Sequence, residues 1–310
     1  MTAAARNTRT IQRCQAPFLI VAVILSLTHP PPHVIALNSG SHGTNGLSRG
    51  DLLKVGFSGI AVGKLVGDVV SRVSRGIAYP DAHEDQVRHV IRRALSEAAT
   101  VNRPLMVLEV GIGTDCRLIR RGLYDEALND LAAKGIHQVE ITGMDIDIPS
   151  YATIQQAEQC LEKATNGGSL NVDLQVVEGD LTSTLPFEPG SFDAIICCLT
   201  LCSVSDPDKA VRSIKSLLRP NGGMFGFVEH VAVNPEEPFR FLDWQQQTLD
   251  PLQQALAHNC HLHRQTENTI ARIFGMEQNE AIRLEHERFL VNDMWPVTCQ
   301  CSGVIRRMSL

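Results

Sequence analysis

Three acidic residues of this chain lie next to short apolar runs, where they could hold a ligand. Glu109 comes just before a turn that contains Gly111 and Gly113, Asp145 ends a second apolar run, and Asp180 follows a third. In an open α/β sheet, ligands bind beside the carboxyl ends of the parallel strands. We therefore expect these acids and glycines to hold one ligand at such an edge.

The glycine turn favours a nucleotide-like ligand that lacks phosphate. Gly111 and Gly113 have no Cβ, so the backbone can turn sharply and approach a ligand, and Thr114 belongs to the same turn. A helix expected to start directly afterwards would offer free N–H groups. A dinucleotide site would have a third glycine where this chain has Asp115, whose carboxylate repels a pyrophosphate. A nicotinamide-dependent oxidoreductase remains the weaker alternative.

S-Adenosylmethionine meets these demands, because its ammonium and sulfonium are cationic and it has no phosphate. Glu109 can face that positive charge, and Asp145 can accept hydrogen bonds from both ribose hydroxyls, with Ile146 beside it in the same site. Asp180 can take the adenine amino group while Leu181 packs against the ring. A helix cap for Asp145 and a turn for Asp180 are the structural alternatives.

The elements that must position these residues alternate along the chain. Five short apolar runs are separated by helical patterns, which predicts a parallel sheet with crossover helices. The runs are Leu105–Val110, Val139–Met144, Leu174–Val177, Phe192–Leu199 and Met224–Val228. Asp81 is the expected N-cap of a helix that covers the edge of the sheet, and Asp206 caps a second helix. Alternation over Pro296–Arg306 predicts an antiparallel edge strand with one buried face.

Together these motifs resemble the class I methyltransferases, and the resemblance covers about Leu105 to Val231. The segments that carry it are Val107–Thr114, Gly143–Asp145, Glu178–Leu181, Phe192–Cys202 and Leu217–Gly223. More narrowly, Cys198–Val204, Val228–Val231, Trp244–Pro251 and Asn259–Arg264 are similar to methyltransferase-like family 7, a group of thiol methyltransferases. The resemblance implies a Rossmann-like α/β fold, S-adenosylmethionine as cofactor and a small-molecule acceptor, with thiols favoured. Asp115 and the long stretch from it to Gly143 depart from the family's pattern.

Methyl transfer needs positioning and a deprotonated acceptor more than a strong catalytic motif. A thiol with a pKa of about 8.5 is already a few per cent thiolate at neutral pH. His230, at the end of the fifth run, is the candidate base, with a structural histidine as the alternative. By resemblance, Cys198 and Leu199 touch the methionyl part of the cofactor, and Cys202 is pocket wall.

Cysteine and histidine spacing predicts no metal site. The nine cysteines are an odd number without C-x-x-C spacing, so no disulfide framework or zinc ribbon follows from them. His261 and His263 stand near Cys260, but that spacing matches no zinc pattern.

Size and charge restrict the class of protein. A chain of 310 residues is long enough for one large domain with a tail. Its net charge of −6 lacks the basic footprint that binding to a nucleic-acid backbone requires. We therefore expect no nucleic-acid partner. Nothing in the pattern indicates an oligomeric state.

The N-terminus has the layout of a targeting segment over residues 1–36. Arginines without acids precede the apolar run Phe18–Leu27, which is too short to span a bilayer and matches a signal-peptide core. We expect the endomembrane system (endoplasmic reticulum) or the secretory route, by a cleaved signal or a retained anchor. A plastid or mitochondrial leader is the alternative.

A linker over residues 37–50 and a methyltransferase domain over residues 51–310, with N-terminal helices, are expected to follow. Gly59, Gly63 and Gly67 would share one helix face. This face suits peripheral membrane association or packing on the domain. It also leaves open a third function, a non-catalytic membrane-associated protein with a methyltransferase-like fold.

Overall fold

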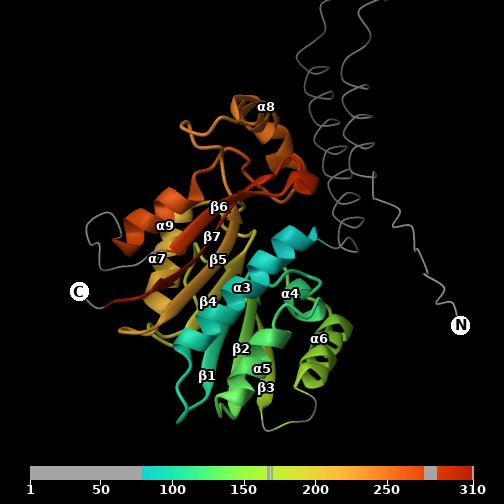
Figure 1. Ribbon diagram of the computed structural model, residues 1–310, viewed down its shortest axis with the longest axis vertical. Helices are drawn as coiled ribbons and strands as arrows, with labels where there is room; N and C mark the ends of the chain where they lie inside the picture. The colour runs from blue at the N-terminus through green and yellow to red at the C-terminus, as the bar shows by residue number, and fades with distance from the viewer. Residues whose placement is uncertain (1–78, 166–167, 169, 276–284, 309–310) are drawn as a thin grey trace, which may run out of the picture. The chain divides into compact units, whose positions relative to one another are not determined.

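The computed structural model describes residues 79–165, 168, 170–275 and 285–308, and within them the chain forms one seven-stranded sheet flanked by helices (Figure 1). The strand order is β3-β2-β1-β4-β5-β7-β6. The strands are β1 (Leu105–Val110), β2 (Gln138–Asp145), β3 (Asn171–Glu178), β4 (Ala194–Cys198), β5 (Met224–His230), β6 (Glu285–Leu290) and β7 (Cys299–Arg306). The helices are α3 (Asp81–Ala98), α4 (Arg117–Arg120), α5 (Asp125–Ala133), α6 (Tyr151–Ala164), α7 (Pro207–Leu217), α8 (Arg240–Leu256), α9 (Thr266–Phe274) and the 3₁₀ turn η1 (Asn292–Met294).

Strands β1 to β5 are parallel, which confirms the five predicted strands. Their ends differ from the prediction by a few residues, and the run predicted as Phe192–Leu199 is regular only over β4. The chain order reverses between β1 and β4, where Val110 pairs with Cys197 on one side and Met144 on the other. This reversal is the topological switch point at which an open α/β sheet binds ligands.

The C-terminal part of the sheet is antiparallel, as predicted, but its last strand does not form the edge. β7 pairs with β5 on one side and with β6 on the other, so β6 is the edge strand. Seven of the eight β7 residues are buried, in place of the single buried face expected. The sequence did not reveal β6, because half of its segment EHERFL is charged, as is common for an edge strand.

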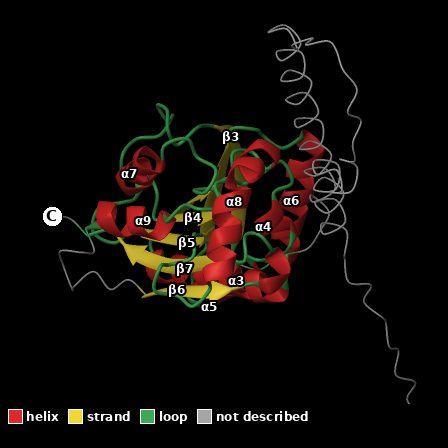
Figure 2. Cartoon of the chain, turned by 90° about the horizontal axis from the view of Figure 1, so that it is seen from above, coloured by secondary structure: helices red, strands yellow, loops and turns green. Residues whose placement is uncertain are grey.

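Helix α3 packs on a face of the sheet, not at its edge as predicted. Its buried stripe, which includes Val90 and Ala94, lies over β5. A Cβ added at Gly226 of β5 would lie 2.8 Å from Val90 Cγ1, so the glycine lets the helix approach closely. Asp81 is the first helical residue rather than the N-cap, and Pro80 occupies the cap without a side-chain hydrogen bond. Helices α4, α5 and α6 lie on the same side (Figure 2).

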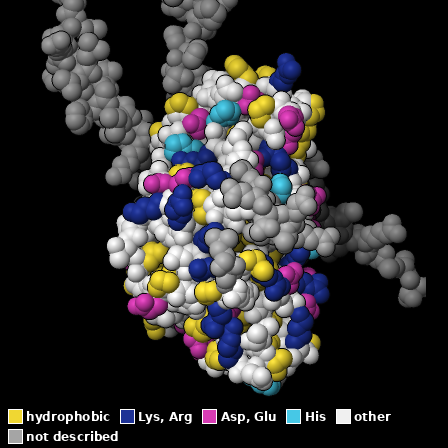
Figure 3. Space-filling model, turned by 90° about the vertical axis from the view of Figure 1, so that its left-hand side faces the viewer, with side chains coloured by type: hydrophobic (Ala, Val, Ile, Leu, Met, Phe, Trp, Pro, Cys, Tyr) yellow, Lys and Arg dark blue, Asp and Glu magenta, His cyan; other side chains and the backbone are white. Residues whose placement is uncertain are grey.

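The other face of the sheet is covered by α7 and α9 (Figure 2). Asp206 caps α7 as predicted, because its side chain accepts a hydrogen bond from the Lys209 N–H. In the view of Figure 3, Lys and Arg side chains stand among acidic and apolar ones instead of forming one unbroken stripe. Charges of both signs therefore mix on this surface.

Several expectations fall on residues that the structure does not describe. They are the targeting segment 1–36, the linker 37–50 and the glycine-spaced segment of residues 52–73. Among the described residues, no helix is long and apolar enough to cross a bilayer.

Candidate functional site

The turn after β1 is joined to the end of β2 by backbone geometry that only glycine adopts easily. Gly111 and Gly113 have φ angles of 72° and 71°. The Gly111 N–H donates to Met144 O at 2.8 Å, and the Gly113 N–H donates to Asp145 Oδ2 at 2.9 Å. A Cβ at Gly111 would collide with the Thr200 side chain. The structure thus brings together the turn, in which Thr114 is half-buried, and the predicted ribose-binding acid.

Asp145 lies at the carboxyl end of β2, half-buried, with its two oxygens facing different partners. Oδ2 accepts from Gly113, and Oδ1 accepts from the Asp147 N–H at 3.2 Å. Each carboxylate oxygen can accept more than one hydrogen bond. Ile146 beside it is 64% exposed, so a large apolar side chain lies at the surface next to Asp145.

Glu109 is buried in β1 and has one oxygen without a partner. Its Oε2 accepts from the Tyr124 hydroxyl at 2.8 Å, whereas Oε1 has no hydrogen-bond partner among the described residues. Burial raises the pKa of Glu109 to about 8, with a smaller contribution from the nearby Asp115 and Asp145 carboxylates, against the Tyr124 hydrogen bond, which lowers it. A buried acid with an unpaired oxygen fits the ammonium of a cationic ligand.

The chain after the glycine turn differs from the expected helix start. Cys116 adopts a left-handed φ of 46°, and α4 is only four residues long, so no long helix begins directly at the turn. Asp115, at the position of the absent third glycine, pairs with Arg117 at 3.1 Å. The Arg117 guanidinium lies 4.3 Å from the centre of the Tyr79 ring. The local negative charge is therefore partly balanced.

Asp180 turns its carboxylate onto its own loop after β3. Oδ1 accepts from the Thr182 N–H at 2.8 Å, which is the turn arrangement named as its structural alternative. The Leu181 side chain is only 4% exposed and packs in the core with Met144. Contact of Asp180 and Leu181 with adenine therefore stays a prediction.

The loop after β4 is held by a buried acid that the sequence analysis did not single out. Glu229 Oε1 accepts from the N–H groups of Thr200 at 2.9 Å and Leu201 at 3.1 Å. Burial raises the pKa of Glu229. Leu199 has a φ of 51°, and its N–H donates to Val228 O at 2.9 Å. An acid within an otherwise apolar strand is the signal that could have identified Glu229.

A second group that the sequence analysis missed lies on the α3 side of Cys198. His83 is fully buried, its Nδ1 lies 2.7 Å from Gln300 Oε1, and its Nε2 lies 3.7 Å from Cys198 Sγ. Burial lowers the pKa of His83. The Tyr79 ring meets the His83 ring edge-on, with 4.7 Å between centroids. The ends of β4, α3 and β7 thus meet around Cys198.

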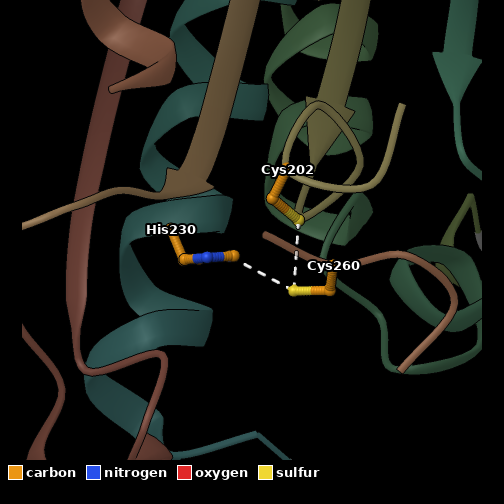
Figure 4. A group of neighbouring side chains, drawn as sticks. All are labelled: Cys202, His230 and Cys260. Carbon is orange, nitrogen blue, oxygen red and sulfur yellow. Dashed lines mark hydrogen bonds between the residues drawn. The ribbon is translucent and has the colours of Figure 1, made fainter. Parts of the chain in front are cut away.

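His230, Cys202 and Cys260 come together although they belong to three separate segments (Figure 4). Cys260 Sγ lies 3.7 Å from Cys202 Sγ and 3.8 Å from His230 Nδ1. All three residues are buried. The hydrogen bond between the thiols raises the pKa of Cys202 and lowers that of Cys260. Sequence reasoning treated Cys202 as pocket wall with no base nearby, because both neighbours are distant in sequence.

The second ring nitrogen of His230 is engaged on the opposite side. Nε2 lies 2.8 Å from the backbone oxygen of His261, so this nitrogen carries the proton and donates. Nδ1 therefore presents its lone pair to Cys260. His230 remains a predicted base, and this contact identifies Nδ1 as the atom that could accept a proton.

Comparison with known proteins places this geometry in context. The model of a family described as "Methyltransferase domain" matches residues 122–226, which include Asp145, Asp180 and the loop after β4 and begin after the glycine turn. The human protein "Thiol S-methyltransferase TMT1A" is 40% identical over 83 residues, which are 27% of this chain and 32% of that protein. Human "Thiol S-methyltransferase TMT1B" is 40% identical over 77 residues, 25% of this chain and 30% of that protein.

These matches are partial. The chain spans about a third of the length of the curated relatives it matches. Among solved structures, a SAM-dependent methyltransferase from Methanosarcina mazei is 17% identical, covering 66% of this chain and 93% of that one, with a TM-score of 0.42. Neither the family match nor the two human relatives support the nicotinamide alternative.

Proposed function

We propose that this chain is a class I methyltransferase that binds S-adenosylmethionine and transfers its methyl group to the sulfur of a small-molecule thiol. The observation that carries the proposal is the joining of the glycine turn to Asp145 at the switch point of the sheet. The printed names of the human relatives support the thiol as acceptor class.

The residues at the carboxyl ends of β1 and β2 fit the cofactor chemically. Glu109 Oε1 would accept from the ammonium, because it is a buried acceptor without a partner. Asp145 would accept from the ribose hydroxyls with the lone pairs that Gly113 and Asp147 leave free. Gly111 and Gly113 would let the backbone approach, with Thr114 in the same turn.

The remaining cofactor contacts follow from the order of the strands. Asp180 and Leu181, after β3, would lie toward the adenine, and Ile146 would cover the face of the site. Cys198 and Leu199, where β4 ends beside β1, would lie toward the methionyl part. These assignments follow from the resemblance together with the place of each residue at one edge of the sheet.

When bound, the cofactor supplies an electrophilic methyl group on a sulfonium. The chain's own residues must orient the acceptor, exclude water and allow the acceptor thiol to lose its proton. Orientation alone can lower the reaction barrier by several kcal/mol. Glu229 fixes the loop after β4 through two backbone N–H groups, so it positions Leu199 and Cys202. His230 is the candidate general base, and its Nδ1 is the atom that would accept the proton.

An assay of methyl transfer with matched acceptors tests the proposal. The full-length chain would be incubated with cofactor carrying an isotopically labelled methyl group and with thiophenol, phenol or aniline. We expect labelled methyl thioether from the thiol and little product from the other two. Product from phenol or aniline but not from thiophenol would show that the acceptor atom is oxygen or nitrogen instead of sulfur. No product from any of the three would count against the enzymatic proposal.

We further propose that the N-terminal segment of residues 1–36 directs the chain to the endomembrane system, with peripheral membrane association. The arginine-flanked apolar run supports this proposal. Mass spectrometry of the mature N-terminus distinguishes a cleaved signal from a retained anchor. A mature chain found in plastids or mitochondria would overturn the endomembrane assignment.

A further inference from the structure

Cys202, His230 and Cys260 form a buried set of soft metal ligands at the carboxyl edge of β4 and β5. One atom from each side chain, two Sγ and one ring nitrogen, lies within 4.8 Å of the others. The set combines the loop after β4, the last residue of β5 and the loop after α8. Two sulfurs and an imidazole nitrogen are ligands that favour zinc over magnesium or calcium.

The spacing of the ligand atoms agrees with tetrahedral zinc. With Zn–S bonds of about 2.3 Å, two sulfurs on a tetrahedral ion lie about 3.8 Å apart. The sulfurs of Cys202 and Cys260 are 3.7 Å apart. A Zn–N bond of about 2.0–2.1 Å gives a sulfur–nitrogen separation of about 3.5 Å, and the Cys260–His230 value is 3.8 Å. The third pair, Cys202 Sγ and the ring nitrogen of His230, lies within 4.8 Å, so these two atoms would have to approach by up to about 1.3 Å to close the set around an ion.

His230 has the second contact that a metal-binding histidine normally has. Its Nε2–H donates to the His261 backbone oxygen, which fixes the tautomer and leaves Nδ1 to act as the ligand atom. This contact is independent of the two cysteines. It orients the ring before any ion arrives.

The two loops that carry the cysteines are fastened to each other. The His261 N–H donates to Cys202 O at 3.0 Å, and Asn259 Nδ2 donates to Ser203 O at 3.0 Å. Arg264 Nη1 donates to Leu201 O at 2.9 Å and to Val204 O at 2.8 Å. The positions of Cys202 and Cys260 are thereby coupled, so the ligand set is largely formed in advance.

We propose that Cys202, His230 and Cys260 bind one Zn²⁺ ion whose fourth position takes the sulfur of the acceptor thiol. Structural zinc sites use four protein ligands, whereas catalytic sites use three and leave one position open. Among the described residues these three alone form such a group. The second half of this inference rests on the proposed thiol methylation, and the zinc site stands without it.

The reaction then balances without a dedicated base. The acceptor R–SH binds zinc and releases its proton to solvent, because a coordinated thiol is deprotonated. The sulfur lone pair forms a bond to the methyl carbon while the methyl–sulfonium bond breaks, giving R–S–CH₃ and S-adenosylhomocysteine. His230 acts here as a ligand, in place of the general base expected from sequence. At pH 7 full ionisation of a thiol with a pKa of about 8.5 raises the thiolate concentration by about 30-fold.

The zinc content of the full-length chain, purified with a reductant and without chelator, tests the first half. We expect about one zinc per chain by elemental analysis, following the three-ligand stoichiometry. Cys202→Ser, Cys260→Ser and His230→Gln should each abolish most of it, whereas Cys160→Ser on α6 should retain it. Cobalt added to metal-free wild type should give sulfur-to-cobalt charge-transfer absorption, a readout that needs no variant to fold. Reduced protein that contains no zinc and takes up none when zinc is added, or protein that takes Cu(I) but not zinc, would overturn the site.

Thiol binding tests the second half and separates it from the proposed function. Thiophenol should shift the cobalt spectrum and phenol should not. Removal of metal should lower the methylation of an alkyl thiol with a pKa of about 8.5 by up to about 30-fold at pH 7, because that thiol is mostly protonated when free. An unchanged spectrum, together with thiol methylation that does not depend on metal, would show that the acceptor sulfur does not bind the zinc. The proposed function would remain valid. A zinc-loaded site with no thiol methylation would contradict the proposed function and leave the zinc site intact.

Discussion

The Asp145 carboxylate and the Gly113 backbone N–H are joined by a hydrogen bond of 2.9 Å across 32 residues of sequence. The contact links the acid expected to grip the ribose to the turn expected to receive the cofactor. Neither feature is specific alone. Their contact at the switch point of the sheet defines one binding edge.

Asp145→Ala should remove most of the cofactor affinity and leave the fold intact. Two hydrogen bonds to a charged acceptor would be lost, at about 1.5–3 kcal/mol each, so Kd should rise by roughly 100-fold or more. Calorimetric titration with S-adenosylhomocysteine measures the change. Asp147→Ala is the control, because that exposed side chain lies two residues away. An affinity that survives Asp145→Ala would remove the ribose assignment.

Gly111→Ala should destabilise the protein more than Gly135→Ala does. Both glycines have left-handed φ angles, 72° and 78°, so both substitutions introduce backbone strain of about 1 kcal/mol. At Gly111 the new Cβ also meets Thr200 Cγ2 at 2.7 Å, whereas at Gly135 nothing lies within 4 Å. The free energies of unfolding of the two variants, measured in urea, separate the backbone strain that both share from the steric clash with Thr200 that only Gly111→Ala introduces. Equal losses would show that Thr200 moves aside at little cost.

Glu109 should make stability fall as pH rises from about 4.5 to about 8. Its pKa is raised to about 8 in the folded chain from an ordinary 4.5, so the folded state keeps a proton that the unfolded state loses in this range. The stabilisation is full below pH 4.5 and is lost toward pH 8. Glu109→Gln cannot titrate, so the difference between variant and wild type should follow that window. Parallel pH profiles of the two unfolding free energies would contradict the raised pKa.

Cofactor binding should release about one proton at pH 7. Glu109 is mostly protonated in the free chain, and an ammonium placed at its Oε1 would favour the ionised form. Calorimetry in buffers of different ionisation enthalpy counts the protons. The Glu109→Gln variant is the matched control and should release none. Wild-type binding without proton release would place the ammonium elsewhere.

Glu229→Ala should lower the free energy of unfolding by about 2–4 kcal/mol, because it leaves the buried N–H of Leu201 and the partly buried N–H of Thr200 without their acceptor. Glu229→Gln keeps one amide oxygen at the same place and should lose less. Glu178→Ala, at the exposed end of β3, should change stability little. Chemical denaturation of the three variants tests this order. A loss in Glu229→Gln as large as in Glu229→Ala would show that charge, not acceptance, is what matters.

The amino-acid sequence determined the features that depend on short stretches of chain. Apolar runs, crossover helices and the cap at Asp206 were predictable because each is a local pattern. The placement of Asp145 beside Gly113 followed from one further rule, that parallel strands bring their carboxyl ends to the same edge. The edge strand β6 was not predicted, because its polar and charged segment has little apolar periodicity.

Tertiary structure decided which distant side chains meet. His83 reaches Gln300 across 217 residues, and Cys260 reaches Cys202 across 58. No sequence period records these distances, because they depend on how α3 packs over the sheet and how two loops are tied together. Cysteine and histidine spacing along the chain therefore predicted no metal site, while the fold brings together one group of three residues, among those described, that could hold an ion. Local sequence can place a residue at the end of a strand, but only packing chooses its neighbour.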